Sequence, residues 1–176
     1  MRKAYWIMMA LLMAPLSAAA QNIPEVELFG GYSHLVGNLS NSSFNLNGFN
    51  GSVEQNFNRW FGGKLDVAAT FGTEAGSKVN SQNIAYGPVF SFRKDPKVRP
   101  FVEGLLGAVR GSSEYLGISQ PEWRFGMLGG GGVDVKLNER VSLRVIEVDY
   151  LLTHFSSARQ DNVRISAGFV FRFGQK

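Results

Sequence analysis

Cysteine is absent from this chain of 176 residues. Its absence excludes a disulfide framework, a thiolate metal site and a lipid anchor attached to an N-terminal cysteine. Charge is also scarce, because charged residues make up 18% of the chain against roughly 25% in an average soluble domain. No run of about 20 apolar residues, the length that a membrane-spanning helix needs, occurs in the sequence. What is abundant instead is glycine, with 21 residues, and phenylalanine, with 14.

The first 20 residues have the features of a secretory signal peptide. Arg2 and Lys3 precede an apolar run over residues 4–14, and Ala18-Ala19-Ala20 supplies a small-residue cleavage signal. A membrane anchor is the alternative, but the apolar run is too short to span a bilayer. We therefore expect a signal peptide over residues 1–20 and one mature domain over residues 21–176. Removing Arg2 and Lys3 lowers the formal net charge of +4, and no basic stripe remains to predict nucleic-acid binding.

Apolar and polar residues alternate with a period of two through most of the mature chain, which predicts β-strands and no helix. The pattern is clearest over 163–173, where Val163, Ile165 and Phe169 lie on one face and Arg164 and Ser166 on the other. Glycine, asparagine, serine and proline interrupt the alternation and separate eight such segments. The expected strands are Glu25–Leu35, Leu46–Phe57, Phe61–Gly72, Asn83–Arg93, Arg99–Arg110, Arg124–Leu137, Val141–Leu152 and Val163–Phe173.

One of these segments, Val141–Leu152, breaks the alternation. Strict period two would place Glu147 and Asp149 on the apolar face. A single extra residue in a β-bulge reverses which face the following residues occupy. We therefore predict a bulge near Val145–Ile146, with Glu147 and Asp149 on the polar face.

The connections between the segments alternate in length. Three are short (Phe57–Phe61, Arg93–Arg99 and Asn138–Arg140) and four are long and polar (Val36–Asn45, Thr73–Gln82, Gly111–Trp123 and Thr153–Asn162). This layout predicts an all-β, eight-stranded, antiparallel up-and-down barrel with both termini at the short-turn end.

Alternation alone does not say which face of the barrel is outside. The charged face also carries small residues, as a narrow interior requires, and aromatic residues of the apolar face gather near segment ends, as in membrane-interface girdles. The segment length matches a tilted membrane-spanning strand. These features favour a transmembrane barrel with its apolar face in lipid. The alternative is a soluble secreted barrel that binds a small apolar ligand inside.

Four segments carry a resemblance to a known family: FGGYSHL (29–35), RPFVEGLLGAVRG (99–111), VSLRVIEVDYLLTHF (141–155) and NVRISAGFVFRFG (162–174). They are similar to the small bacterial outer-membrane β-barrels that include the OmpA N-terminal domain and OmpX. The resemblance implies a Gram-negative outer-membrane location, contact with outer-membrane lipids and lipopolysaccharide, and a monomer.

The resemblance also implies a signal for the barrel-assembly machinery in the last strand, carried by Phe169, Phe171 and Phe173. In the family this signal usually ends at the last residue, whereas here Gly174-Gln175-Lys176 follow.

Charged residues on the polar face are the first candidate site. A buried charge costs several kcal/mol unless it is paired, and an eight-stranded barrel has room only for its own side chains. We therefore expect a charge network that fills the lumen, and a narrow porin-like channel is the alternative. The expected network is Glu27, Glu54, Lys64, Asp66, Glu103, Asp134, Lys136, Arg144, Glu147, Asp149 and Arg164.

A catalytic alternative rests on His154-Phe155-Ser156, which resembles the His-x-Ser of outer-membrane lipid A deacylases. No glutamate follows at the expected spacing, and Asp161 lies nearby at a different one. His34 is the only other histidine, which excludes a site with several histidine ligands. We expect no enzymatic activity, no cofactor and no metal.

The long connections are the second candidate site, because exposed loops on a rigid barrel commonly carry binding residues. Apolar and aromatic residues stand among polar ones in the connection 111–123, and the candidates are Tyr115, Leu116, Ile118 and Trp123. The sequence thus predicts an outer-membrane barrel with a structural or surface-interaction role.

Overall fold

The computed structural model describes residues 23–39, 42–74, 77–115, 118–119, 122–155 and 158–174. The expected signal peptide lies outside these residues. The strands are β1 (Val26–Leu39), β2 (Ser42–Asn56), β3 (Phe61–Glu74), β4 (Ser77–Ser91), β5 (Val98–Tyr115), β6 (Ile118–Ser119), β7 (Glu122–Lys136), β8 (Val141–Phe155) and β9 (Ala158–Phe173). In the described part of the chain, no helix is long and apolar enough to cross a membrane.

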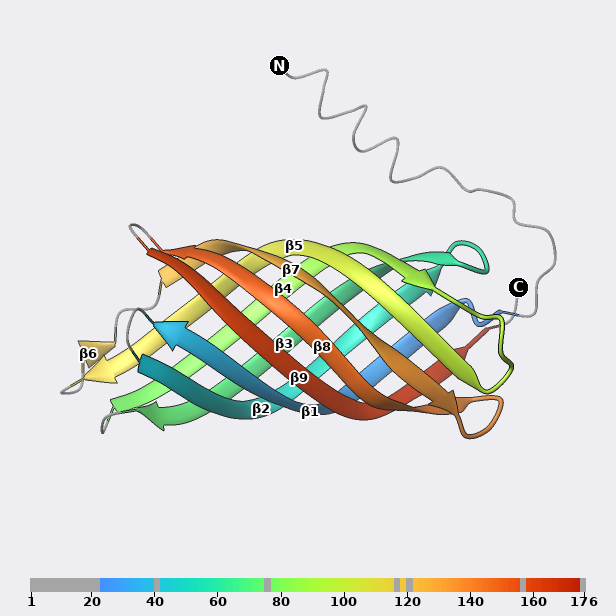
Figure 1. The fold of residues 1–176 in the computed structure, drawn as a ribbon, viewed down its shortest axis with the longest axis horizontal. Helices are drawn as coiled ribbons and strands as arrows, with labels where there is room; N and C mark the ends of the chain where they lie inside the picture. Colours follow the sequence, from blue (N-terminus) through green and yellow to red (C-terminus); the bar gives the residue numbers. More distant parts are fainter. Residues whose placement is uncertain are drawn as a thin grey trace, which may run out of the picture.

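The eight long strands close into an antiparallel barrel (Figure 1). Neighbours around the barrel follow the order β4-β3-β2-β1-β9-β8-β7-β5, and pairing of β4 with β5 completes the ring. The first and last strands pair along their whole length, from Val26 opposite Phe173 to Asn38 opposite Asp161. Closure satisfies the backbone hydrogen bonds that an open sheet would leave exposed in lipid. The predicted fold class is confirmed.

The strands reach further than the alternation predicts. β1 continues to Leu39 and β2 begins at Ser42, so most of the predicted long connection 36–45 is paired strand, with Leu39 opposite Ser42. The connections predicted over 73–82, 111–123 and 153–162 are shortened in the same way, and the last two contain β6 and the paired start of β9. The predicted strand ends were wrong because strands pair through backbone hydrogen bonds, which do not depend on the side chains. The alternation of apolar and polar residues stops before the backbone pairing does.

Each short turn is closed by an asparagine or aspartate side chain. Asn58 accepts hydrogen bonds from the backbone N–H groups of Trp60 and Phe61, at 3.0 and 2.9 Å. Asp95 and Asn138 each accept hydrogen bonds from the backbone N–H groups of the residues two and three positions later. Such side chains mimic a backbone turn and favour a tight reversal. The hydrogen bonds from the backbone of the next residues lower the pKa of Asp95 below its usual value.

The predicted bulge in β8 is confirmed. Arg144 pairs with Gly168 and Glu147 with Ser166, so two residues of β8, Val145 and Ile146, face a single position of β9. Both bulge residues are about half exposed on the outer face, whereas Glu147 is fully buried. The extra residue thus returns the following acidic side chains to the interior.

The apolar face points outward around the barrel. In β9, Phe169 is 50% exposed, whereas Arg164 on the opposite face is 2% exposed. The same contrast holds in the other long strands, where most large apolar side chains are exposed on the outside and the charged ones are buried inside. At the short-turn end, Trp60 stacks on Phe90 with ring centroids 5.9 Å apart, and Phe61 packs against the same ring at 5.3 Å. Such an aromatic cluster is typical of a membrane-interface girdle.

Candidate functional site: the charged barrel interior

The interior holds a dense set of charged side chains. Of the predicted network, all but Lys136 are buried inside the barrel: Glu27, Glu54, Lys64, Asp66, Glu103, Asp134, Arg144, Glu147, Asp149 and Arg164. The side chain of Lys136 is 29% exposed and pairs with Glu139 in the short turn after β7. Lys136 therefore lies at the mouth of the barrel. Hydrogen bonding to Lys136 lowers the pKa of Glu139.

Lys64 forms the first link across the lumen. Its Nζ atom lies 2.5 Å from a carboxylate oxygen of Glu147 on β8 and 2.7 Å from one of Glu103 on β5. β3 and β8 are four places apart around the ring in either direction, so they face each other across the barrel. The ammonium group of Lys64 therefore bridges opposite walls of the barrel.

A second link crosses the barrel nearer the short turns. Arg99 on β5 donates a hydrogen bond to Glu27 on β1, and these strands are again four places apart. The guanidinium of Arg99 also contacts Asp134 at 2.5 Å, and Asp134 in turn accepts from Nε of Arg144 at 2.8 Å. Arg99 is not part of the predicted network, because it stands at the first position of its expected strand, near the short turns.

Arg164 links a third set of strands. It reaches Asp66 on β3 at 2.7 Å and Asp149 on β8 at 2.8 Å. The amide groups of Asn50 and Asn83 donate further hydrogen bonds to Asp66, at 3.1 and 3.2 Å. Charge-assisted hydrogen bonds of this kind are roughly twice as strong as neutral ones.

Two aromatic rings support the network from inside. The Arg144 guanidinium lies 4.5 Å from the ring centroid of Phe29 and 4.2 Å from that of Phe101, and Lys64 lies 5.4 Å from the Phe101 ring. Desolvated cation–π contacts contribute about 2 kcal/mol each. Their sequence signal was an aromatic residue on the polar face of a strand.

A cluster of buried apolar side chains lies next to the network, on the side away from the short turns. Leu105 and Val109 follow Glu103 along β5 on the same inward face, and Leu151 follows Asp149 along β8. Together with Ala85 and Leu128 they form one buried cluster. The cluster comes from four consecutive strands of the ring, β4, β5, β7 and β8, so it lines one side of the barrel interior beyond Glu103 and Asp149.

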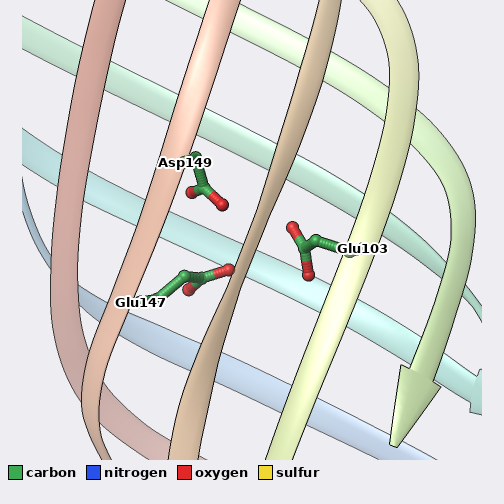
Figure 2. Close-up of side chains that lie close together, drawn as sticks. All are labelled: Glu103, Glu147 and Asp149. Carbon is green, nitrogen blue, oxygen red and sulfur yellow. The ribbon is translucent and has the colours of Figure 1, made fainter.

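Three carboxylates, those of Glu103, Glu147 and Asp149, point toward one another from β5 and β8 (Figure 2). Each offers an oxygen within 4.8 Å of the others, which is the one group in the described residues with the spacing of a metal site. Lys64 already contacts two of them, and Arg164 contacts Asp149. The positive charge that this cluster needs is supplied by the protein's own side chains.

Gly130 allows two of these carboxylates to approach. It stands opposite Glu103 on one side and opposite Asp149 on the other. A Cβ atom built at Gly130 would lie 2.9 Å from Cα of Asp149 and also collide with its carboxylate. The glycine-rich stretch of β7 therefore leaves space for acidic side chains of both neighbouring strands.

The other predicted residues lie elsewhere. The side chains of Phe169, Phe171 and Phe173 are about half exposed on the outer face of β9. Tyr115, Ile118 and Trp123 belong to β5, β6 and β7, so they are in strands and not in the predicted loop, and Leu116 lies outside the described residues.

Trp123 is exposed, and the guanidinium of Arg110 lies 5.9 Å from its ring centroid. For the catalytic alternative, His154 lies in β8 and Asp161 in β9, whereas Ser156 is outside the described residues.

Comparison with solved structures finds the same fold in bacterial outer-membrane proteins. Neisserial surface protein A (NspA) matches with a TM-score of 0.75 and 16% identity, over 85% of this chain and 97% of that one. Ail of Yersinia pestis matches with a TM-score of 0.60 and 22% identity, over 85% and 99%. The N-terminal β-barrel domain of OprF from Pseudomonas aeruginosa gives 0.60 and 13%, over 87% and 100%. No curated protein matches the sequence significantly.

A family model described as the outer membrane protein beta-barrel domain matches residues 7–173, which is nearly the whole chain. The match confirms the resemblance and the outer-membrane location, and it overturns the alternative of a soluble secreted barrel. This chain belongs to the outer membrane protein beta-barrel domain family of Gram-negative bacteria.

Proposed function

We propose that the protein is a structural or surface-interaction barrel of the outer membrane whose lumen is plugged by its own charged side chains. The observation that carries the proposal is the pair of links between opposite walls, Lys64 to Glu147 and Arg99 to Glu27. An ion that moved along the axis would have to break both links. Removing one partner of a buried ion pair costs about 3–5 kcal/mol.

The apolar cluster around Leu105, Val109 and Leu151 supports the same proposal. It lines one side of the lumen, on β4, β5, β7 and β8, so a hydrated ion would also have to pass buried apolar side chains there. Apolar constrictions oppose ion flow by excluding water. The alternative is the narrow porin-like channel.

Conductance in planar lipid bilayers separates these two functions. We expect no conductance steps from the purified barrel. The triple variant Lys64→Ser, Glu103→Ser and Glu147→Ser removes the central link with no change in the number of residues, and it should conduct more than the wild type. Leu65→Ser, on the lipid-facing side of β3, is the matched control and should stay closed. Regular single-channel steps from the wild type would contradict the plug and favour the channel.

Two further parts of the proposal concern export and assembly. We infer that the signal peptide is cleaved after residue 20, so N-terminal sequencing of the membrane protein should begin at Gln21. The aromatic side chains of Phe169, Phe171 and Phe173 would be read by the barrel-assembly machinery. Replacing all three by serine should reduce the amount of assembled barrel, whereas Phe92→Ser, on the outer face beyond β4, should not. We also expect a monomer in contact with lipid and lipopolysaccharide.

We propose no catalytic role. Lipid A from cells that contain the wild-type protein should have the same acyl chains as lipid A from cells with His154→Ala. Loss of an acyl chain only in the presence of the wild type would establish the deacylase alternative.

A further inference from the structure

A cavity of about 480 Å³ opens at the short-turn end of the barrel. Ligand pockets span about 300–1,000 Å³, so the cavity has room for a small molecule. One acidic residue, Asp95, contributes to its lining. The cationic side chains around it are Arg59, Arg93, Lys97, Arg99, Lys136 and Arg172. In transmembrane barrels the short turns face the periplasm, so we call this cavity the periplasmic vestibule.

Some of these cations already have carboxylate partners. Arg93 and Arg99 both donate to Oε1 of Glu27, and Lys136 pairs with Glu139. Asp95 lies at the rim, and its side chain accepts the backbone N–H groups of its own turn. Glu27 and Glu139 are therefore already paired with Arg93, Arg99 and Lys136, and Asp95 is bonded to the backbone of its own turn.

The remaining cations lack such a partner. Within the described residues, no carboxylate lies within ion-pair distance of Arg59 or Lys97. Arg172 reaches Glu27 only at 4.0 Å, and its Nε atom is buried with no hydrogen-bond acceptor among the described residues. None of these three cations is thus hydrogen-bonded to a carboxylate of the described residues; the negative charges that act on them are Glu27, 4.0 Å from Arg172, and Asp95, in the same turn as Lys97.

Two arginines at the rim are joined by hydrogen bonds to each other's backbone. Arg59 donates to the backbone carbonyl of Arg93 at 3.0 Å, and Arg93 donates to that of Arg59 at 3.4 Å. These mutual bonds connect the first and second short turns and hold both arginines in the lining of the same cavity. Like charges held together are stabilised by an anion between them, and the arginine fork matches phosphate oxygens in a bidentate geometry.

We propose that the periplasmic vestibule binds a phosphate-bearing anion with two or more negative charges. Arg59, Lys97 and Arg172 contact its oxygens, while Arg93 and Arg99 remain paired with Glu27. A diphosphate matches the charge of this set better than a single carboxylate, which neutralises only one of the three free cations. The phosphate can belong to a soluble molecule of the periplasm or to the headgroup of an anionic lipid at the rim.

Titration with inorganic pyrophosphate tests the site on the full barrel in a zwitterionic detergent. The double variant Arg59→Gln and Lys97→Gln removes two of the free cations. Both residues are exposed and lie outside the strands, so the barrel should still fold, which heat-modifiable gel migration checks. Lys94→Gln with Arg140→Gln is the matched control, because it removes two cations from the same end that do not line the cavity.

We expect one saturable pyrophosphate site in isothermal titration calorimetry, retained by the control. The Arg59 and Lys97 double variant should bind at least tenfold more weakly, since it removes charge-assisted hydrogen bonds to the phosphate oxygens. Absence of saturable binding by the wild type overturns the proposal. An equal loss in both double variants also overturns it, because the effect would then come from the general charge of this end.

Native mass spectrometry with phosphatidylglycerol or phosphatidylcholine identifies the source of the phosphate. If the barrel retains phosphatidylglycerol, and pyrophosphate displaces it, the natural occupant is a lipid headgroup. If pyrophosphate binds equally well with either lipid present, the occupant is a soluble anion. In both cases the same double variant should lose the binding.

Discussion

Lys64 on β3 and Glu147 on β8 form an ion pair 2.5 Å long between opposite walls of the barrel. The two residues are 83 positions apart in the sequence. Their side chains meet at the axis together with Glu103, so one ammonium group serves two carboxylates. The stability of the interior therefore depends on a cation whose two ion-pair partners lie on strands that are not adjacent to its own.

Replacing Lys64 by methionine should lower the free energy of unfolding by about 3–5 kcal/mol, because it leaves buried carboxylates without their cation. Urea unfolding of the barrel in lipid vesicles measures the loss. At lower pH these unpaired buried carboxylates become protonated and neutral. The difference in unfolding free energy between the variant and the wild type should therefore shrink as the pH falls. The combination Lys64→Met, Glu103→Gln and Glu147→Gln removes charge and partners together and should recover most of the stability. A deficit independent of pH would contradict this account.

Gly129 and Gly130 offer a matched pair in β7. A methyl group at Gly130 would collide with Asp149, whereas the space around Gly129 is open for 4 Å. We expect Gly130→Ala to destabilise the barrel by about 1–3 kcal/mol, the usual cost of overpacking. Gly129→Ala should be neutral or stabilise slightly, because alanine reduces the entropy of the unfolded chain. Equal changes in the free energy of unfolding for the two variants would show that the side chains around Gly130 can move to accept a methyl group.

Deleting Val145 should prevent assembly of the barrel. The deletion removes the bulge, so Glu147 and Asp149 would turn toward lipid. Lys64 and Arg164 would then lose these ion-pair partners. Heat-modifiable migration on a gel reports the folded fraction. Val145→Ala keeps the number of residues and should fold normally, so a folded deletion variant would mean that another residue can form the bulge.

Arginine on the lipid face should destabilise the barrel according to its depth. Leu106 and Val98 lie on the same outer face of β5, the first near the middle of the strand and the second at its turn end. We expect Leu106→Arg to cost about 2–4 kcal/mol and Val98→Arg about 0–1 kcal/mol. Equal costs for the two variants would show that the lipid boundary lies elsewhere on β5.

Much of the fold could be predicted from local pattern. Alternation located the eight strands, and the broken parity at Glu147 and Asp149 predicted the bulge, because side-chain direction in a strand depends only on position. Strand ends were harder to predict. The pairing of Leu39 with Ser42 has no amphipathic signal, since apolar and polar residues no longer alternate with a period of two over 36–45.

The candidate site was predictable as a set of residues but not as a set of contacts. Sequence placed Lys64, Glu103 and Glu147 on the inward face, yet which cation meets which carboxylate depends on how the closed ring brings distant strands together. Arg99 was missed because it stands at the first position of its expected strand, and its contact with Glu27 across the barrel has no signal in the sequence. Phe29 and Phe101 look like exceptions to alternation until Arg144 is seen between them.

The sequence by itself determined the strands, their two faces, the bulge and the family, because each of these depends on local periodicity or on a shared local pattern. Only the tertiary structure decided that Lys64 and Arg99 cross the lumen and that an apolar cluster lines one side of it. It also decided that cations from separate turns and strand ends surround one vestibule. Barrel closure is the physical reason, since it sets the distance between residues that no sequence pattern relates.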